Sequence, residues 1–505
     1  MQKNIIFLIF DEGNRSHIVL YETLVRAGFG SKVIYYLNDN AVNLAALNKF
    51  VKSNDPLFLG FSFASHSVQV AFSVGASFTK EFPGVPLIFG GAHPTIDPLS
   101  CLEYCDAVCV GEGEGAILEI AEKLTRKENY LSSHNLIYKK DGNIVKNAMN
   151  SLIADLDTLP VRRPFTKDHF LVSEGRVLEI DRAQYLKLFP DGKTRFMQVY
   201  SRGCPNACSY CCNSLFRSIY PDWPKVRIQS AEATIKEMQE MLRINPSIIR
   251  MSINDDCFLG RSSQWLKDFV QKYNAAIGKE LNYLTCPEHV TLEKLRILND
   301  IDVRYISIGL QSGSKKTNAL YNRPFSSERF LSACNLIHAQ KIGLVVHMIF
   351  DNPWEDADDI FDTLDVLTQI KKPFYILQFS LKIYPGTKLY EHCIAKSLNM
   401  LSYNTKYEHY YSVQRTDINR IITLAQFLPR CIIFSFFKNR EKATFKILVR
   451  LAYFFAAIYM PFHVLRICGS RRLRDNIAIA LSHGTIAERW VKGKSPPSCS
   501  TKKTP

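Results

Sequence analysis

The sequence predicts an α/β fold made of two successive series of strand–helix units and a helical C-terminal tail. Short apolar runs alternate with helical patterns over the first 130 residues, and again from about residue 194 to residue 400. Such alternation indicates parallel strands joined by crossover helices. The chain has 505 residues, too many for one ordinary core, so two or three domains are expected.

The first series predicts a doubly wound parallel sheet within residues 1–130. Its five apolar runs lie at 4–10, 32–37, 56–63, 85–91 and 106–113. Ligands bind such sheets at the carboxyl ends of strands. The residues placed there are mostly glycines, which permit close backbone approach but are equally explained by tight turns: Gly90, Gly91, Gly111, Gly113 and Gly115.

The second series predicts most of a TIM-like barrel, with six βα units and one open side. Its apolar runs lie at 195–203, 247–255, 281–286, 303–311, 343–350 and 375–386. Turn-rich residues before it suggest a hairpin and a linker. The expected organisation is therefore a first domain at 1–130, a linker at 131–193, a barrel at 194–400 and a helical tail at 401–505.

The cysteines of this chain are expected to be reduced. The N-terminus has one Lys, an apolar run and then acidic residues, which fits a first β-strand better than a signal peptide. A chain in the cytoplasm keeps its thiols reduced, so a cysteine cluster there indicates metal binding or catalysis.

The basic charge belongs to the tail. The chain carries +15, yet residues 430–505 alone hold 15 Lys/Arg against 3 Asp/Glu. The rest is nearly neutral, so the charge gives no reason to expect that the whole protein binds nucleic acid.

The segment SRGCPNACSYCCNS, residues 201–214, spaces Cys204, Cys208 and Cys211 as C-x3-C-x2-C. Cys212 is adjacent to Cys211, so both cannot easily ligate one ion. No second C-x2-C pair lies nearby, as a structural zinc site would need. Three thiolates can hold a 4Fe–4S cluster and leave one iron open for a ligand. A zinc loop is the alternative.

With Tyr210 before its last cysteine, this motif resembles that of the radical S-adenosylmethionine (SAM) superfamily. The resemblance implies that Cys204, Cys208 and Cys211 ligate a 4Fe–4S cluster. It also implies that the open iron chelates SAM, which an electron cleaves to methionine and a 5′-deoxyadenosyl radical.

Further barrel segments extend the resemblance and imply a SAM site. NDDCF at 254–258 resembles an acidic family motif, and IGLQSGS at 308–314 with YNR at 321–323 resembles a fourth-strand motif. Gln311 stands where relatives often have Glu. DNPWED at 351–356 departs from a G-x-P-G-E turn. The implied SAM-binding residues are Tyr210, Asp255, Asp256, Gln311, Ser312, Arg323, Pro385 and Gly386.

Residues 90–120 are similar to the cobalamin-binding domain that precedes the barrel of many radical SAM enzymes. The resemblance implies a cobalamin site at Gly90, Gly91, His93, Gly111, Glu112 and Gly113. One departure concerns the cobalt ligand. The mutase-type motif D-x-H-x-x-G is missing, and His17 is not at its spacing, so that histidine is not expected to hold cobalt.

The two resemblances together imply a cobalamin-dependent radical enzyme, most simply one that methylates an unactivated carbon. Relatives also close or contract rings. A methylthiotransferase is an alternative, although residues 1–100 contain no cysteine for its second cluster. A non-catalytic metal-binding protein is another. Expected partners are a flavodoxin- or ferredoxin-like reductant and a small or lipid-like substrate.

The tail contains an apolar run from Ile447 to Cys468, about long enough to span a bilayer. Arg450, His463 and Pro461 argue against spanning. Its basic flank favours a helix lying on a membrane, and a helix that closes the barrel is the alternative. The expected location is cytoplasmic, with possible peripheral contact to a membrane.

Overall fold

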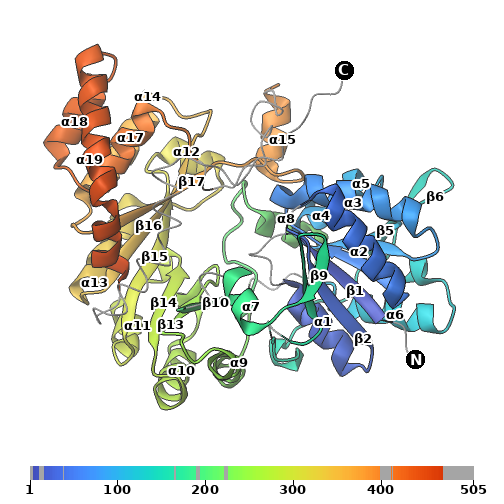
Figure 1. The fold of residues 1–505 in the computed structure, drawn as a ribbon. Coiled ribbons are helices and arrows are strands. Elements are labelled where there is room, and N and C mark those ends of the chain that lie inside the picture. The colour runs from blue at the N-terminus through green and yellow to red at the C-terminus, as the bar shows by residue number, and fades with distance from the viewer. Residues whose placement is uncertain are drawn as a thin grey trace. The chain divides into compact units, whose positions relative to one another are not determined.

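A nine-stranded mixed sheet forms the N-terminal part of the protein (Figure 1). The computed structural model describes residues 4–10, 16–37, 39–163, 166–188, 194–220, 226–397, 411 and 413–469. The strand order is β7-β6-β5-β4-β3-β1-β2-β8-β9, and the strands from β5 to β2 run parallel. The five predicted strands are β1 (Asn4–Ile9), β2 (Gly30–Tyr35), β3 (Phe58–Ser62), β4 (Leu87–Gly90) and β5 (Ala107–Cys109). The doubly wound sheet is thereby confirmed.

Both faces of this sheet are covered, as continuous apolar strands require. One face packs with helices α1 (Ser16–Arg26) and α6 (Glu114–Thr125), and the other with α2 (Ala41–Asn54) and α3 (Val68–Glu81). Strand β1 shows the alternation, because Phe7 faces the first core and Leu8 faces the second.

Two hairpins extend the sheet at its edges. Strands β6 (Leu136–Lys140) and β7 (Asn143–Lys146) join β5 antiparallel, while β8 (His169–Ser173) pairs parallel with β2 and antiparallel with β9 (Arg176–Glu179). The region expected as a hairpin and linker therefore contains two hairpins that complete the sheet. Polar, exposed strand β7 and short strand β9 protect the edges from further pairing.

Six parallel strands in chain order form the second sheet, an open half-barrel. They are β10 (Arg195–Gln198), β13 (Arg250–Ile253), β14 (Glu280–Thr285), β15 (Val303–Gln311), β16 (Gly343–Phe350) and β17 (Tyr375–Ser380). This confirms the partial TIM-like barrel.

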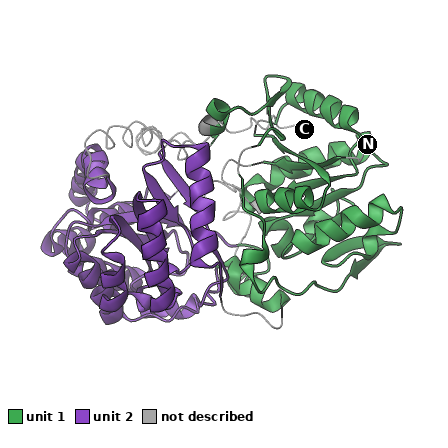
Figure 2. Ribbon diagram, turned by 90° about the horizontal axis from the view of Figure 1, so that it is seen from below, with its two compact units in different colours: residues 1–190, 211–224, 384–407 green, residues 191–210, 225–383, 408–505 purple. Residues whose placement is uncertain are grey.

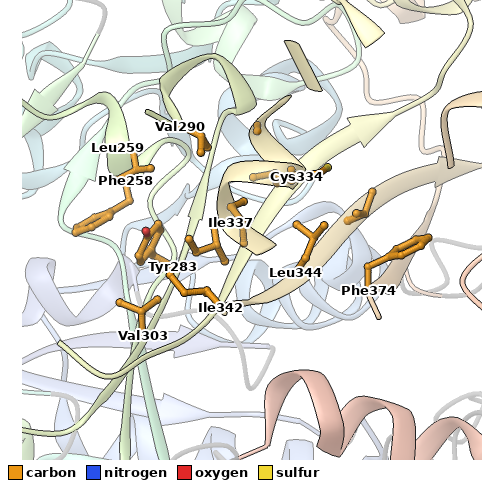
Figure 3. Close-up of a cluster of buried hydrophobic side chains, with 14 of the residues drawn as sticks. Phe258, Leu259, Tyr283, Val290, Val303, Cys334, Ile337, Ile342, Leu344 and Phe374 are labelled. Carbon is orange, nitrogen blue, oxygen red and sulfur yellow. The ribbon is translucent and has the colours of Figure 1, made fainter. Parts of the chain in front are cut away.

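Helices line the outer side of the half-barrel and bury one continuous core (Figure 1). They are α9 (Ala231–Ile244), α10 (Ser263–Ala276), α11 (Leu292–Leu298), α13 (Ser327–Ala339) and α14 (Ala357–Gln369). Figure 3 shows part of this core, where Tyr283 and Leu344 from the strands lie with Phe258, Cys334 and Ile337. The apolar packing fixes the strands whose carboxyl ends carry the polar motifs.

The described residues of the tail, 411 and 413–469, include the helices α17 (Asp417–Leu424), α18 (Arg430–Lys438) and α19 (Ala443–Cys468). Ile421, Ile433 and Val449, one from each helix, join the half-barrel core. The helical character expected of the tail holds over these residues. The final stretch, 470–505, lies outside the described residues.

The chain divides into two compact units (Figure 2). The first comprises residues 1–190, 211–224 and 384–407, and the second comprises residues 191–210, 225–383 and 408–505. The chain thus crosses between the units directly before Cys211. Helix α8 (Cys212–Ile219), which follows the cysteine motif, belongs to the unit of the N-terminal sheet.

Candidate functional site

The cysteine motif occupies the loop that follows β10 and the two-residue strand β11 (Ser201–Arg202). Gly203 turns the chain with a φ of +95°, in the region that favours glycine. Cys204 and Cys211 are half-buried and Cys208 is buried. Cys211 is the N-cap of α8, and the Ser214 hydroxyl donates to its carbonyl oxygen at 2.7 Å.

Residues of the YNR motif hold the middle of this loop. The Ser209 amide donates to the Tyr321 carbonyl at 2.8 Å, and the Asn322 side chain donates to the Ala207 carbonyl at 2.9 Å. The ring of Tyr210 meets the ring of Tyr321 edge-on at 4.9 Å between centroids. These contacts bring together two motifs that lie more than 100 residues apart in the sequence.

Arg323 places its guanidinium beside the loop. It donates to the Gly309 carbonyl of β15 at 2.8 Å and hydrogen-bonds to the Cys208 thiol. A rigid, charged fork at this point suits the carboxylate of a ligand. Its role as a SAM-binding residue stays a prediction.

The two aspartates after β13 have different surroundings. Asp255 is completely buried and accepts from the Tyr200 amide at 2.6 Å, from the Ser201 amide at 3.0 Å and from the Arg261 guanidinium. Its carboxylate is thus committed to holding the chain just before the cysteine loop. Asp256 is exposed.

Two further cysteines lie at the carboxyl ends of neighbouring strands and were missed in the sequence. Cys286, after β14, hydrogen-bonds to Cys204 and to Cys257, which follows β13. The side-chain Nδ2 of Asn206 donates to Cys286 Sγ at 3.6 Å. Because Cys286 donates its thiol proton, it lowers the pKa of Cys204 and lowers the pKa of Cys257 to about 6. Only knowledge of which strands are neighbours could have grouped them.

Gln311 ends β15 with a left-handed backbone, φ +66°. Its side-chain oxygen Oε1 is buried and finds no hydrogen-bond donor among the described residues. A buried acceptor of this kind is costly unless it is satisfied. An ammonium group of a ligand would satisfy it, so the residue fits the position predicted for SAM.

Ser312, in contrast, is saturated by the protein. Its hydroxyl donates to Glu355 Oε1 at 2.8 Å and lies 3.2 Å from Thr363 Oγ1. Burial raises the pKa of Glu355 to about 7, although the bond from Ser312 opposes this. Glu355 belongs to the DNPWED turn, whose role the sequence left open.

The first glycine loop follows β4. Gly91 has a φ of +95°, and a Cβ there would lie 3.0 Å from both the Phe63 amide nitrogen and carbonyl oxygen. His93 is 2% exposed, and its Nδ1 shares a hydrogen bond of 3.0 Å with the Ser65 hydroxyl. Its Nε2 is buried without a partner among the described residues. Burial lowers the pKa of His93, so its ring is neutral near pH 7.

The second glycine loop follows β5 and is tied to the first. The Thr95 hydroxyl donates to the Gly91 carbonyl at 2.8 Å and accepts from the Gly111 amide at 3.1 Å. The Glu112 amide donates to the Tyr220 hydroxyl at 2.8 Å, and Asn135 donates to the Glu112 carbonyl at 3.0 Å.

Glycine is required by the surrounding protein at some positions of the two loops and not at others. A Cβ at Gly111 would lie 2.1 Å from the Tyr220 hydroxyl, so glycine is required there by the protein itself. At Gly113 the nearest atom would be 3.5 Å away, on Leu20, and at Gly90 it would be 3.7 Å away. Close approach of a ligand remains a prediction for these three positions.

Pro385 and Gly386 lie in the turn before α15 (Lys388–Ala395). Gly386 has a φ of +74°, and a Cβ there would lie 2.9 Å from the Ile96 carbonyl and 3.3 Å from Leu215. Gly386, Ile96 and Leu215 all belong to the first unit. The glycine is explained by this packing, and contact of the turn with SAM stays a prediction.

His17 lies in α1, the helix that follows β1. It is fully buried, and its Nε2 shares a hydrogen bond of 3.1 Å with the Tyr35 hydroxyl in the sheet core. Its ring centroid is 6.4 Å from that of His169. The residue therefore has a structural role in this core.

The residues present fit the implied cofactors by their chemistry. Three thiols on one loop suit an iron–sulfur cluster, the unsatisfied Gln311 Oε1 suits SAM, and the unsatisfied His93 Nε2 beside Gly91 suits cobalamin. Over the described ranges, no three His, Cys, Asp or Glu side chains are gathered in the geometry of a single-ion site. The ligand roles of Cys204, Cys208 and Cys211 thus rest on their spacing.

Comparison with known proteins matches a family model to each of two parts of the chain. Residues 199–367 match the radical SAM superfamily, and residues 19–121 match the B12 binding domain. An uncharacterized methyltransferase of Pyrococcus horikoshii is 23% identical over 435 residues, covering 83% of this chain and 88% of the relative.

Two solved structures share the fold. The cobalamin-dependent radical SAM enzyme OxsB, with aqua-cobalamin and SAM bound, has a TM-score of 0.64, with 14% identity and coverage of 97% of this chain and 80% of OxsB. The methyltransferase TsrM of Kitasatospora setae, with cobalamin and a [4Fe-4S] cluster bound, has a TM-score of 0.62, with 14% identity and coverage of 78% and 75%.

The chain is therefore a radical SAM enzyme with an N-terminal B12-binding domain. The combination of these two domains is the one found in cobalamin-dependent radical SAM enzymes. Its domains imply a 4Fe–4S cluster, SAM and cobalamin as cofactors.

Proposed function

We propose that this protein methylates an unactivated carbon: a 5′-deoxyadenosyl radical would remove a hydrogen atom from that carbon, and methylcobalamin would supply the methyl group that replaces it. The carrying observation is the placement of α8. This helix starts at Cys211 of the cluster motif, and the residue after it, Tyr220, hydrogen-bonds to the predicted cobalamin loop at Glu112. One short segment thus connects the last cysteine of the cluster motif with the predicted cobalamin loop.

When bound, the cluster and SAM supply the radical, and cobalamin supplies the methyl group. Cys204, Cys208 and Cys211 would hold the cluster. Arg323 would bind a carboxylate, because its fork is already oriented by the Gly309 carbonyl. Gln311 would accept a hydrogen bond from an ammonium group at its unsatisfied Oε1.

The B12-binding domain would hold cobalamin with backbone and neutral groups. His93 offers a neutral ring with an unsatisfied Nε2, next to the positive-φ turn at Gly91. At Gly90 and Gly113 a Cβ would make only ordinary van der Waals contacts, so the fold itself does not require glycine there, and close approach of a ligand is the proposed reason. His17 is committed to the sheet core through Tyr35, which supports binding without a histidine from the D-x-H-x-x-G position.

A methylthiotransferase and a cyclase or rearrangement enzyme are the other candidate reactions. The absence of cysteine from residues 1–100 disfavours the first, which needs a second cluster. A cyclase would share the radical step but would not transfer a methyl group. The comparison with a methyltransferase over 83% of the chain favours methyl transfer.

We also propose the partners. A radical SAM enzyme needs an electron donor, and a flavodoxin- or ferredoxin-like reductant in the cytoplasm would serve. The substrate is proposed to be small or lipid-like, and the protein is proposed to meet a membrane only peripherally. The support for peripheral contact is that α19 packs against the half-barrel along one face.

The reaction is tested by analysing the products of SAM. Reconstituted, reduced protein with SAM and cobalamin should form 5′-deoxyadenosine by reductive cleavage of SAM and S-adenosylhomocysteine by methyl transfer from SAM to reduced cobalamin. Cys208→Ala should abolish the first product, whereas Cys212→Ala should keep both. Formation of 5′-deoxyadenosine alone would replace the methyltransferase by a cyclase or rearrangement enzyme.

A further inference from the structure

Helix α19 carries a stripe of eight large apolar side chains that are exposed. The stripe consists of Ile447, Leu448, Leu451, Phe454, Phe455, Ile458, Tyr459 and Phe462, each between 45% and 66% exposed. At about 100° per residue, these positions cover roughly 140° of the helix circumference. They form one continuous face rather than scattered surface residues, and such faces mark interaction sites.

The opposite face of α19 is fixed to the second unit. Val449, Met460 and Ile467 are buried, and His463 Nε2 lies 2.8 Å from the Phe374 carbonyl oxygen. Arg450 pairs with Asp417 of α17 at 3.1 Å. By length and composition α19 could cross a membrane. Its buried residues instead pack against the half-barrel and α17. The stripe is therefore presented outward by an anchored helix.

Positive charge surrounds the stripe. Lys438, Lys442 and Lys446 lie before or near its N-terminal end, and Arg466 lies just beyond its C-terminal end. In the sequence, Arg471, Arg472 and Arg474 follow. Glu441 is the sole acidic residue between positions 430 and 469. An apolar face flanked by cations is complementary to an anionic lipid surface, which offers hydrocarbon beneath negative headgroups.

We propose that the α19 stripe docks on the surface of an anionic bilayer, with the helix lying in the interface and not crossing it. The inference rests on the peripheral contact proposed for this enzyme and names the residues and lipids that make it. A lipid-like molecule drawn from that bilayer is the corresponding substrate class. A second copy of the chain is a poorer occupant, because two basic tails would then meet.

The test is sedimentation of the full-length protein with vesicles. The protein should bind vesicles that contain phosphatidylglycerol. Its partition coefficient on vesicles of phosphatidylcholine alone should be lower by about tenfold or more. The triple variant Phe454→Ser, Phe455→Ser, Phe462→Ser should lower the partition coefficient by about tenfold or more, since apolar burial contributes to attachment. Salt at 0.5 M should release most of the protein, because charge attraction is then screened within about 4 Å.

The matched control is Val42→Ser, Leu99→Ser, which removes exposed apolar side chains of the first unit and should leave vesicle binding unchanged. Thermal melting must show that both variants stay folded. The proposal would be overturned if the triple variant bound vesicles as well as the wild type. It would also be overturned if the wild-type protein did not bind vesicles but formed a dimer in light scattering that the triple variant does not form. Vesicle binding needs no turnover, so its failure would leave the proposed methyl transfer standing.

Discussion

The hydroxyl oxygen of Tyr220 lies 2.8 Å from the amide nitrogen of Glu112 and accepts its hydrogen bond. Tyr220 follows the helix that Cys211 caps, and Glu112 lies in the second glycine loop. The two residues are 108 positions apart in the sequence and both belong to the first unit. The end of the cysteine segment therefore fixes the backbone of the loop that is predicted to bind cobalamin.

Replacing Tyr220 by Phe should weaken cobalamin binding. The change removes the acceptor of the Glu112 amide and leaves a donor unsatisfied, which costs about 1–3 kcal/mol. The loop should then populate other conformations, and the dissociation constant for hydroxocobalamin should rise about tenfold, as measured by absorbance after gel filtration. Tyr138→Phe, at a buried tyrosine of the neighbouring strand β6, is the control and should bind as wild type. Unchanged affinity in Tyr220→Phe would show that this bond does not support the site.

Bulky residues at the two glycine loops should separate stability from binding. Gly113→Val should eject cobalamin with little loss of stability, because a Cβ there would lie at ordinary distances from its neighbours, 3.5 Å from Leu20 and 3.9 Å from the Cys109 sulfur. Gly91→Val should lower both, because its φ is strained for a side chain and its Cβ would press on the Phe63 backbone. Urea unfolding and cobalt content check the two effects. Retention of cobalamin by folded Gly113→Val would place the ligand elsewhere.

Asp255→Ala should destabilise the half-barrel and loosen the cysteine loop. The variant leaves the Arg261 guanidinium buried without its carboxylate, and breaking such a pair costs about 3–5 kcal/mol. It also removes the acceptor for the Tyr200 and Ser201 amides. Urea unfolding should show the loss, and iron should be retained poorly. The exposed neighbour gives the control: Asp256→Ala should unfold like wild type.

Glu355 should make the protein less stable as the pH rises from 5 to 8. Its pKa is raised from 4.5 to about 7 by burial, so the folded state holds the proton at a pH where the unfolded chain releases it. The stabilisation is complete below about pH 4.5 and is lost as the pH approaches about 7. Relative to Glu355→Gln, wild-type protein should lose on the order of 2 kcal/mol across this range in urea unfolding.

The adjacent carboxylate, Asp356, serves as a control because its pKa is shifted in the opposite direction. The Lys316 ammonium lowers the pKa of Asp356 to about 2, so Asp356 is ionised in both states throughout this range. Asp356→Asn should therefore leave the slope between pH 5 and 8 unchanged. An identical slope in wild type and Glu355→Gln would mean that Glu355 ionises normally.

The parallel strands could be predicted because local patterns determine them. Apolar runs found nearly every parallel strand, and parallel strands place their carboxyl ends on one edge. The structure brings Cys208 and Arg323, from motifs at two of those ends, into contact, and their roles in binding stay predictions. The same reasoning could not see that α8 and Tyr220 belong with the N-terminal sheet, because no local pattern encodes long-range packing.

The sequence also could not predict which of two neighbouring side chains points into the core and which points to solvent. Asp255 and Asp256 are indistinguishable as letters, yet one is buried with Arg261 and the other is exposed. Cys286 drew no attention as a single cysteine and acquires its contact with Cys257 only through the pairing of β13 with β14. For α19, composition left membrane contact and barrel packing as alternatives, whereas the structure packs one face of the helix on the half-barrel and leaves the opposite face exposed.

The central claim is that one chain holds an iron–sulfur cluster and cobalamin together, and metal analysis of the same preparation tests it most directly. After anaerobic reconstitution with iron, sulfide and hydroxocobalamin, the full-length protein should contain about four irons and about one cobalt per chain. Cys204→Ala, Cys208→Ala and Cys211→Ala should each lose the iron, and Cys212→Ala should keep both metals. Iron without cobalt would remove cobalamin from the account, and equal loss of iron in Cys212→Ala would contradict the assignment of the cluster ligands.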